Sequence, residues 1–273
     1  MNKYPLDLTK AKKYLQGILP EVGKCISTNF YKGNIRKRKK GPGNYVTEID
    51  TWAEDIIKSK LEKEYSNISI LTEERSPKDY TNINFKDPIW VIDPIDGTTN
   101  FIKGYPNFAT SIGLVCNYQP ILGVVYNPLS EELFTAEADM PFALRNGNKM
   151  VSSIIKILNE ASVCVNLSYE ISESQKMFKM LYLLCDKVAD IKILGSTVND
   201  LISVAQGKTD IYFQLGAFPW DLAAASLIVA KSGYEICTFE GREWNILSPN
   251  IIAVNKFLHK KMLNLLGIIS NET

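Results

Sequence analysis

The sequence predicts a mixed α/β fold (of α+β character) with an antiparallel-rich N-terminal half and a C-terminal half that alternates strands and helices. Two observations carry this prediction. Three apolar segments within residues 109–136 are separated only by short turns, which is typical of an antiparallel meander. Beyond about residue 150, short apolar segments alternate with helical patterns. Because no Ser/Gly-rich linker divides the chain, we expect residues 1–150 and 151–273 to form one compact unit.

Residues 7–30 are expected to form the first helix, because their apolar positions recur at intervals of three and four. These positions are Leu8, Ala11, Leu15, Ile18 and Val22. Residues 32–43 are basic and then broken by glycine and proline, so we expect a loop. The remaining elements expected in this half are a helix at 47–65 and strands at 68–71, 89–92, 109–116, 120–126 and 132–136.

The C-terminal half is expected to begin with a strand and then alternate. The expected strands are residues 162–166, 191–194, 210–214 and 251–254. The expected helices are residues 172–187, a segment that opens near Ser196, and residues 219–232.

Composition excludes several classes of protein. The chain has 273 residues, 45% of them apolar, and a formal net charge of +1, which argues against a dedicated nucleic-acid binder. It has no apolar run long enough to span a bilayer, and its first residues lack the apolar core of a secretory signal. The five cysteines are odd in number and form no C-x-x-C pair. We therefore expect no disulfide framework or zinc site, and a reducing cytoplasmic location.

A single histidine, His259, narrows the chemistry further. Ser-His-Asp triads, histidine phosphatases and His-rich metal sites all need a positioned imidazole. His259 lies in a basic helical stretch, where we interpret it as a solvated surface residue. The chemistry of this chain is therefore expected to rely on carboxylates and hydroxyls.

The run from Asp93 to Thr98 is the strongest candidate for a functional site. A buried apolar strand delivers Asp93 at its end, Pro94 is expected to end the strand, and Asp96 returns a second carboxylate. Gly97 permits a close backbone approach, and Thr98 is a good residue to open a helix. Two carboxylates beside the free N–H groups of a helix start favour a site for magnesium and phosphate. The alternative is that Asp96 merely caps the helix.

Three further segments supply acids that fit the same site. Glu73 and Glu74 follow a predicted strand, so one of them can point toward Asp93. Asp221 lies at the start of a helix rich in small residues, and Asp50 lies in the first turn of another. Taken alone, each of these acids is equally well explained as a surface charge or as an acid favoured by a helix dipole.

Together these segments resemble the inositol monophosphatase family, a superfamily of lithium-sensitive, Mg²⁺-dependent phosphatases. The resemblance covers nearly the whole chain. It rests on Val46-Thr47-x-x-Asp50, Glu73-Glu74, the block from Asp93 to Phe101, Gly195-Ser196 and Trp220-Asp221-x-Ala223-Ala224. It implies a layered αβαβα sandwich, usually as a homodimer, that acts on a small phosphorylated substrate.

The resemblance also implies roles for individual residues. Asp93 would bridge two magnesium ions, with Glu73 and the Ile95 carbonyl completing the first site and Asp96 and Asp221 completing the second. A third, weaker magnesium would lie near Glu73.

For the reaction itself, the resemblance implies that Asp50 and Thr98 are paired and orient the attacking water, with Glu73 also catalytic. The N–H groups of Gly97 and Thr98 would hold the phosphate. Magnesium supplies the charge neutralisation that phosphoryl transfer needs, so the lack of a histidine base is no obstacle.

Substrate contacts are expected from the phosphate side and from the C-terminal half. The full set is Asp96, Gly97, Thr98, Gly195, Ser196, Thr197, Gln214 and Asp221. Gln214 stands where the family has an acid, which weakens an assignment to inositol phosphate alone; the alternative for Gln214 is an exposed strand residue. The cations at residues 36–40 would steer polyanionic substrates, or would belong to a solvated surface loop.

Other phosphatase classes fail on the sequence. Pro94 stands where a haloacid-dehalogenase nucleophile is required, no cysteine lies in an H-C-x₅-R loop, and Ile202 replaces the first glycine of a P-loop. Within the family we expect a phosphatase of a sugar or polyol phosphate, with inositol-1-phosphate first. The rivals are phosphatases of fructose-1,6-bisphosphate, NADP(H), histidinol phosphate or 3′-phosphoadenosine 5′-phosphate. A non-catalytic regulatory or binding protein on the same fold is the alternative of another class.

Overall fold

The computed structural model describes residues 4, 6–33, 35–41, 43–76, 79–80 and 82–272, with side chains through residue 266. The helices are α1 (Leu8–Lys32), α2 (Glu48–Glu64), α3 (Thr98–Lys103), α4 (Ile171–Leu184), α5 (Thr197–Ala205), α6 (Pro219–Lys231) and α7 (His259–Glu272). A 3₁₀ turn spans Leu158–Glu160.

The strands form three sheets. The first nine strands are β1 (Lys37–Gly41), β2 (Asn44–Thr47), β3 (Ser69–Thr72), β4 (Ile89–Asp96), β5 (Ala109–Cys116), β6 (Gln119–Asn127), β7 (Glu132–Glu137), β8 (Leu144–Arg145) and β9 (Asn148–Lys149). The others are β10 (Ser162–Val165), β11 (Asp190–Ile193), β12 (Ile211–Gln214), β13 (Glu235–Cys237) and β14 (Ile251–Val254).

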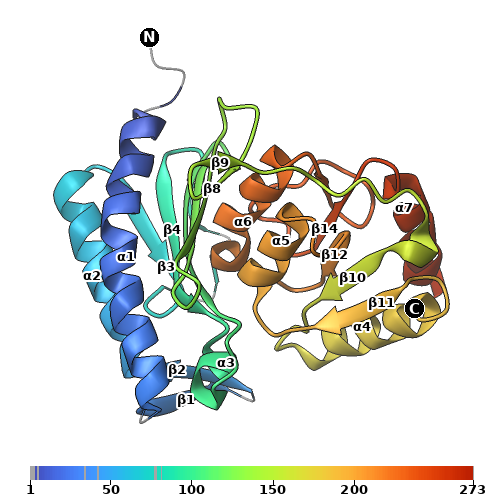
Figure 1. Cartoon of the computed structure of the whole chain (residues 1–273), viewed down its shortest axis with the longest axis horizontal. Coiled ribbons are helices and arrows are strands. Elements are labelled where there is room, and N and C mark those ends of the chain that lie inside the picture. Colours follow the sequence, from blue (N-terminus) through green and yellow to red (C-terminus); the bar gives the residue numbers. More distant parts are fainter. Residues whose placement is uncertain are drawn as a thin grey trace.

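The two larger sheets lie in five layers with the helices. A seven-stranded sheet runs β3-β4-β5-β6-β7-β8-β9 and a five-stranded sheet runs β11-β10-β12-β14-β13. Figure 1 shows α1 and α2 outside the first sheet, α5 and α6 between the two sheets, and α4 and α7 outside the second. Three separate apolar cores fill the spaces between these layers. The predicted αβαβα sandwich is confirmed.

The two halves have the expected styles. Strands β5, β6 and β7 are antiparallel neighbours in sequence order, as the meander prediction requires. In the second sheet β10 lies parallel to both β11 and β12. Helices α5 and α6 follow residue 150 yet pack against the first sheet as well, so they join the halves. The division of the chain near residue 150 stays a prediction.

The prediction of a loop over residues 32–43 was wrong for residues 37–41, which form strand β1. Residues 34 and 42 lie outside the part of the chain that the structure describes. Strand β1 pairs antiparallel with β2, and Arg38 lies opposite Val46. A run of five cations carries no apolar alternation, so only the pairing with β2 defines this strand. The sequence also missed the short strands β8, β9 and β13, which have too few residues to show a period.

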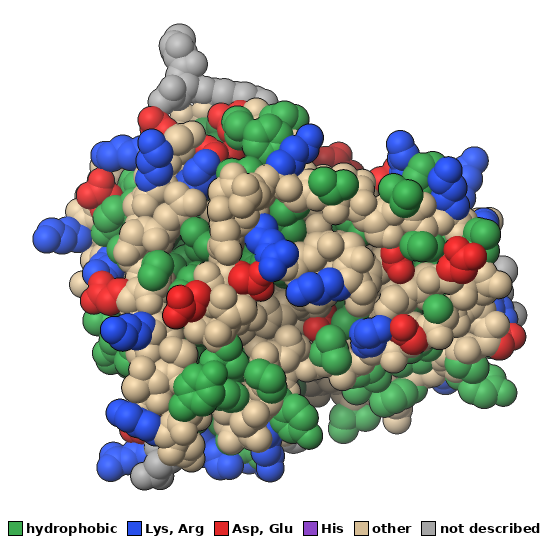
Figure 2. Space-filling model, in the orientation of Figure 1, with side chains coloured by type: hydrophobic (Ala, Val, Ile, Leu, Met, Phe, Trp, Pro, Cys, Tyr) green, Lys and Arg blue, Asp and Glu red, His purple; other side chains and the backbone are tan. Residues whose placement is uncertain are grey.

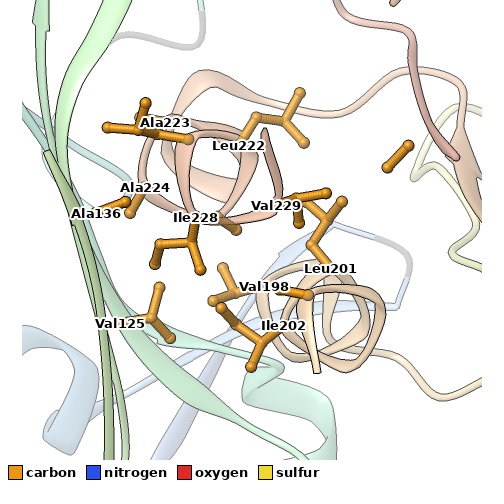
Figure 3. Close-up of a cluster of buried hydrophobic side chains, with 14 of the residues drawn as sticks. Val125, Ala136, Val198, Leu201, Ile202, Leu222, Ala223, Ala224, Ile228 and Val229 are labelled. Carbon is orange, nitrogen blue, oxygen red and sulfur yellow. The ribbon is translucent and has the colours of Figure 1, made fainter. Parts of the chain in front are cut away.

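Helix α6 lies unusually close to the first sheet. A Cβ on Gly113 would come within 2.7 Å of the Ala223 Cβ, and a Cβ on Gly123 within 2.5 Å of the Ala224 carbonyl oxygen. Figure 3 shows Ala223 and Ala224 on the side of α6 that faces the strands carrying Val125 and Ala136. Two glycines on neighbouring strands therefore set how closely α6 approaches the sheet.

Among the described residues, no helix combines the length and hydropathy that a bilayer crossing needs. All five cysteines are free thiols. The cytoplasmic location remains a prediction.

Replacing Gly123 with alanine is expected to destabilise the protein by about 1–3 kcal/mol, because α6 must move away from β6 to admit the new methyl group. The matched control is Gly17→Ala in α1, where an added Cβ meets nothing within 4 Å. That change is expected to stabilise the helix by about 0.5–1 kcal/mol. Urea unfolding of both variants measures the difference, and equal effects would show that α6 does not depend on the glycine.

Candidate active site

A β-bulge in β4 brings Asp93 and Asp96 to the same side of the sheet. Asp93 lies opposite Ser111 and Asp96 opposite Ala109, so β4 contains one residue more than β5 over this stretch. Residues three apart in a regular strand point to opposite faces, and one extra residue reverses that. The expectation that Pro94 ends the strand was wrong: the strand continues to Asp96, because a bulge tolerates a residue with no N–H.

Three carboxylates converge where β4 ends. Asp93, Asp96 and Asp221 each offer an oxygen, and these oxygens lie within 4.8 Å of one another. Asp93 Oδ1 is buried and has no hydrogen-bond partner among the described residues. Burial, followed by the charge of Glu73, raises the pKa of Asp93 well above its ordinary value. An unpartnered oxygen within an all-carboxylate donor set fits a hard cation such as Mg²⁺.

Asp221 reaches this cluster from the first turn of α6. Pro219 begins the helix, and the Phe218 N–H donates to Asp221 Oδ2 at 3.0 Å. One carboxylate oxygen therefore fixes the helix start while the other remains for the cluster. Burial and the charge of Asp96 raise the pKa of Asp221.

Asp96 is held by the N-terminus of α5, in the other half of the chain. Its Oδ2 accepts from the Ser196 hydroxyl, and from the Val198 N–H at 2.9 Å. These donors favour the ionised form, yet burial outweighs them and raises the pKa of Asp96 to about 7. The alternative in which Asp96 caps the helix after it is wrong, because Gly97 occupies the N-cap of α3.

Glu73 enters the site because β3 and β4 are parallel and end together. Thr72 lies opposite Ile92, and the Glu73 N–H donates to the Ile92 carbonyl at 3.1 Å. Lys40, from β1, donates to Glu73 Oε1 at 2.9 Å and to both oxygens of Glu74 at 2.9 and 3.0 Å. One cation of the basic segment is therefore committed to the site.

Asp50 and Thr98 are brought together as the resemblance implied. The Thr98 hydroxyl lies 3.0 Å from Asp50 Oδ1 and 3.1 Å from the Ile95 carbonyl oxygen. Asp50 Oδ2 accepts from the Thr47 N–H at 2.9 Å, in a capping box that fixes the carboxylate. Burial raises the pKa of Asp50 to about 6.

Gly97 occupies a position that no other residue fits. Its φ is +92°, and a Cβ there would come within 2.8 Å of the Asn107 carbonyl oxygen. This left-handed residue is the N-cap of α3, and both Gly97 and Thr98 line the cavity that holds the acids.

The cavity has a volume of about 290 Å³, and its far wall comes from the C-terminal half. Gly195, Thr197 and Gln214 line it together with Asn166 and Tyr169, which belong to none of the sequence motifs. Gln214 is only 3% exposed, so its interpretation as an exposed strand residue is wrong. Asn166 closes a predicted strand, a position that points to a site, whereas the sequence holds no comparable signal for Tyr169.

Ser196 lies apart from the other predicted substrate contacts. It is fully buried and does not line the cavity; its hydroxyl instead donates to Asp96. The structure thus gives Ser196 a part in orienting a carboxylate, which the spacing of the motif could not show.

His259 lies at the surface, as expected, but it is only partly solvated. Its side chain is 26% exposed, its Nδ1 contacts a carboxylate oxygen of Glu235, and its Nε2 lies 3.4 Å from the Cys237 sulfur. Glu235 and Cys237 belong to β13, which the sequence did not predict, so the contact was invisible there. His259 takes no part in the acidic site.

Comparison of the sequence with known proteins identifies the same family as the arrangement of the site. The family model of the inositol monophosphatase family matches residues 7–270. The Nus factor SuhB of Escherichia coli is 34% identical over 245 residues, 89% of this chain and 90% of that protein. The inositol monophosphatase of Dictyostelium discoideum is 32% identical over 260 residues, 93% of this chain and 95% of that protein.

Solved structures agree. The extragenic suppressor protein SuhB of Bartonella henselae superposes with a TM-score of 0.86 at 29% identity, covering 94% of this chain and 98% of that one. The Thermotoga maritima IMPase gives 0.82 at 30% identity, covering 93% and 95%.

The fold and the acidic site thus define a phosphoric monoester hydrolase with a metal-binding centre. The chain belongs to the inositol monophosphatase family, whose members depend on magnesium.

The raised pKa values predict an unusual dependence of stability on pH without metal. Burial places the pKa of Asp50 at about 6, of Asp96 at about 7 and of Glu74 at about 8, against about 4 in an unfolded chain. The folded protein therefore binds more protons than the unfolded chain between about pH 4 and 8, and its stability falls as pH rises through this window. Mg²⁺ is expected to raise the Tm more at pH 8 than at pH 5.5.

Thermal unfolding of chelator-treated protein with and without Mg²⁺ tests this expectation. Asp93→Asn should reduce the Mg²⁺ effect, and the exposed Asp139→Asn is the matched control. A metal-free Tm that rises steadily from pH 5 to pH 8 would contradict the assignment.

Proposed function

We propose that this protein hydrolyses the phosphate monoester of a small sugar or polyol with Mg²⁺, and that inositol-1-phosphate is the first substrate to test. One observation carries the proposal. The acid cluster, the Asp50–Thr98 pair and the backbone of Gly97 and Thr98 line a single cavity or border it. Its volume suits a small phosphate ester rather than a macromolecule.

Five residues would hold the metal. Asp93, Asp96 and Asp221 supply carboxylates, and Glu73 and the Ile95 carbonyl complete the set for two ions, with a third near Glu73. Bound magnesium lowers the pKa of water and offsets the charge on the phosphoryl oxygens.

Glu73 would join the metal through Oε2, because Lys40 already donates to Oε1 at 2.9 Å. Lys40 would also retain Glu74 as its partner, through its two other contacts.

The protein's own contribution to the reaction is mainly positioning. Asp50 Oδ1 accepts a hydrogen bond from the Thr98 hydroxyl, which leaves the lone pairs of the Thr98 oxygen to accept a hydrogen bond from the attacking water. The N–H groups of Gly97 and Thr98 would hold the phosphate as donors at a helix start. The Asp50–Thr98 pair would thus orient the water while the N–H groups of Gly97 and Thr98 hold the phosphate. This arrangement favours attack on phosphorus in line with the leaving oxygen.

The leaving alcohol would contact the far wall of the cavity. Gly195, Thr197 and Gln214 face it directly, Asp96 and Asp221 lie at its metal side, and Ser196 acts through Asp96. Fructose-1,6-bisphosphate, NADP(H) and 3′-phosphoadenosine 5′-phosphate remain the rival substrates.

A regulatory binding role is the second candidate, and two features favour it. Several relatives are named as Nus factor SuhB. Arg36, Lys37, Arg38 and Lys39 are exposed, and Figure 2 shows Lys and Arg side chains gathered at the end of the molecule where β1 lies. Catalysis is favoured by the six site residues that match the motifs of the family: Asp50, Glu73, Asp93, Asp96, Thr98 and Asp221. Mg²⁺-dependent, lithium-inhibited phosphate release distinguishes the two roles, and a panel that yields no release favours the regulatory one. The homodimer also remains a prediction.

Asp93→Asn is expected to lower phosphate release by about 10³-fold or more, because it removes charge from the centre of the metal cluster. Isothermal titration should show weakened Mg²⁺ binding, while circular dichroism should show an intact fold. Asp139→Asn provides the surface control. Near-normal turnover in Asp93→Asn would mean that the metal assignment is incorrect.

Thr98→Ala is expected to lower kcat by about 10- to 100-fold with little change in Mg²⁺ affinity, because it removes a group that positions water rather than one that holds metal. Thr98→Ser keeps the hydroxyl and should retain most of the activity. Parallel measurements of kcat and Mg²⁺ affinity make the comparison. Equal activity in the alanine and serine variants would remove Thr98 from the mechanism.

A further inference from the structure

The side-chain oxygen of Gln214 already accepts two hydrogen bonds from other residues of the protein. Oε1 accepts from the Thr197 hydroxyl at 3.0 Å and from the hydroxyl of Tyr212, which is fully buried. Gln214 itself is 97% buried and lines the active-site cavity. An amide has one oxygen and one NH₂ group, so the position of the oxygen determines what the cavity receives.

The direction of these hydrogen bonds follows from a backbone donor. The Leu167 N–H donates to Asn166 Oδ1 at 2.9 Å, and a backbone N–H can only donate. The Asn166 amide nitrogen is therefore the atom that lies 3.0 Å from Thr197 Oγ1, and it donates there. Thr197 then has its own proton left, and it donates this proton to Gln214 Oε1 at 3.0 Å.

The opposite orientation of Gln214 is unfavourable for the same reason. If its NH₂ group faced Thr197 and Tyr212, both hydroxyl protons would lose this acceptor, and Thr197 would receive two donors. The relay from Leu167 through Asn166 and Thr197 therefore fixes the Gln214 NH₂ group toward the cavity. A buried donor left unpaired costs binding energy, so the bound ligand must match it.

We propose that the alcohol part of the substrate presents a neutral hydrogen-bond acceptor to Gln214, and that a carbonyl or ring oxygen suits this site better than a hydroxyl, which can also accept but brings a proton that needs a partner of its own. This inference rests on the proposed phosphatase function and specifies its substrate class. A carboxylate at this position would instead accept from a substrate hydroxyl. The single change to glutamine therefore reverses the hydrogen-bond preference of this wall.

Charge favours a neutral acceptor over an anionic one. Asn166, Thr197, Tyr212 and Gln214 are all uncharged. Among the described residues that line the cavity, Lys40 is the one cation, and two glutamates already hold it. A second phosphate or a carboxylate at Gln214 would therefore be buried among uncharged groups with no cationic side chain beside it.

A matched set of phosphate esters tests this inference on the intact protein with Mg²⁺. Dihydroxyacetone phosphate and glycerol-3-phosphate differ by a carbonyl in place of a hydroxyl, 3-phosphoglycerate supplies a carboxylate, and inositol-1-phosphate offers hydroxyls only. Wild type should prefer the carbonyl ester to the hydroxyl ester in kcat/KM, and Gln214→Glu should lower this ratio by about 10-fold. The carboxylate ester should be the poorest of the three-carbon substrates.

Thr197 tests the orientation of the amide. Thr197→Val removes the donor that holds Oε1, so Gln214 can rotate and the preference ratio should fall toward one, whereas Thr197→Ser should restore it. Thermal unfolding of each variant checks folding separately from preference.

Release from the panel with a ratio that Gln214→Glu leaves unchanged would overturn the inference and leave the phosphatase function standing. Preference for 3-phosphoglycerate would overturn the neutral acceptor. No release from any ester would overturn the proposed function, and the inference with it.

Discussion

The hydrogen bonds between Asp96 and the start of α5 are the interaction on which the site depends. Asp96 ends a strand of the first sheet, while its donors, Ser196 and the Val198 N–H, belong to the C-terminal half. The partial positive charge of a helix start favours a carboxylate there. One side chain therefore positions the far wall of the cavity relative to the acidic cluster, and the close approach of α6 to the first sheet places Asp221 in that cluster.

This arrangement concentrates negative charge where water is excluded. Asp50, Asp93 and Asp96 are nearly or fully buried, and burial is the largest cause of the raised pKa of each. Without a cation, the folded state retains these groups by protonation or by ion pairs such as those of Lys40. The repulsion among these buried carboxylates destabilises the folded protein without a cation, and the same charges give the site affinity for a divalent ion. One set of charges therefore affects both stability and function.

The two sides of the cavity differ in how they recognise a ligand. The acidic side carries charge and follows the residue pattern of the family. The opposite side presents an uncharged relay, from Leu167 through Asn166 and Thr197 to Gln214, and Gln214 departs from that pattern. In the proposed function, charge would recognise phosphate on any alcohol, whereas the orientation of one amide would select among alcohols. Reaction type and substrate choice would then depend on different residues.

The sequence by itself determined the order of the main strands and helices, because their apolar periods are long enough to detect, and it determined the reaction class through the motif around Asp93. Tertiary structure alone decided what depends on pairing between distant segments. The bulge that aligns Asp93 with Asp96 arises because β4 has one residue more than β5 over this stretch. Strand β1 is defined only by its pairing with β2. His259 contacts residues of β13, a strand that the sequence did not predict. Ser196 donates to Asp96, which lies 100 residues earlier in the sequence. Local patterns record which face of an element is apolar, but they do not record which distant donor a polar atom will meet.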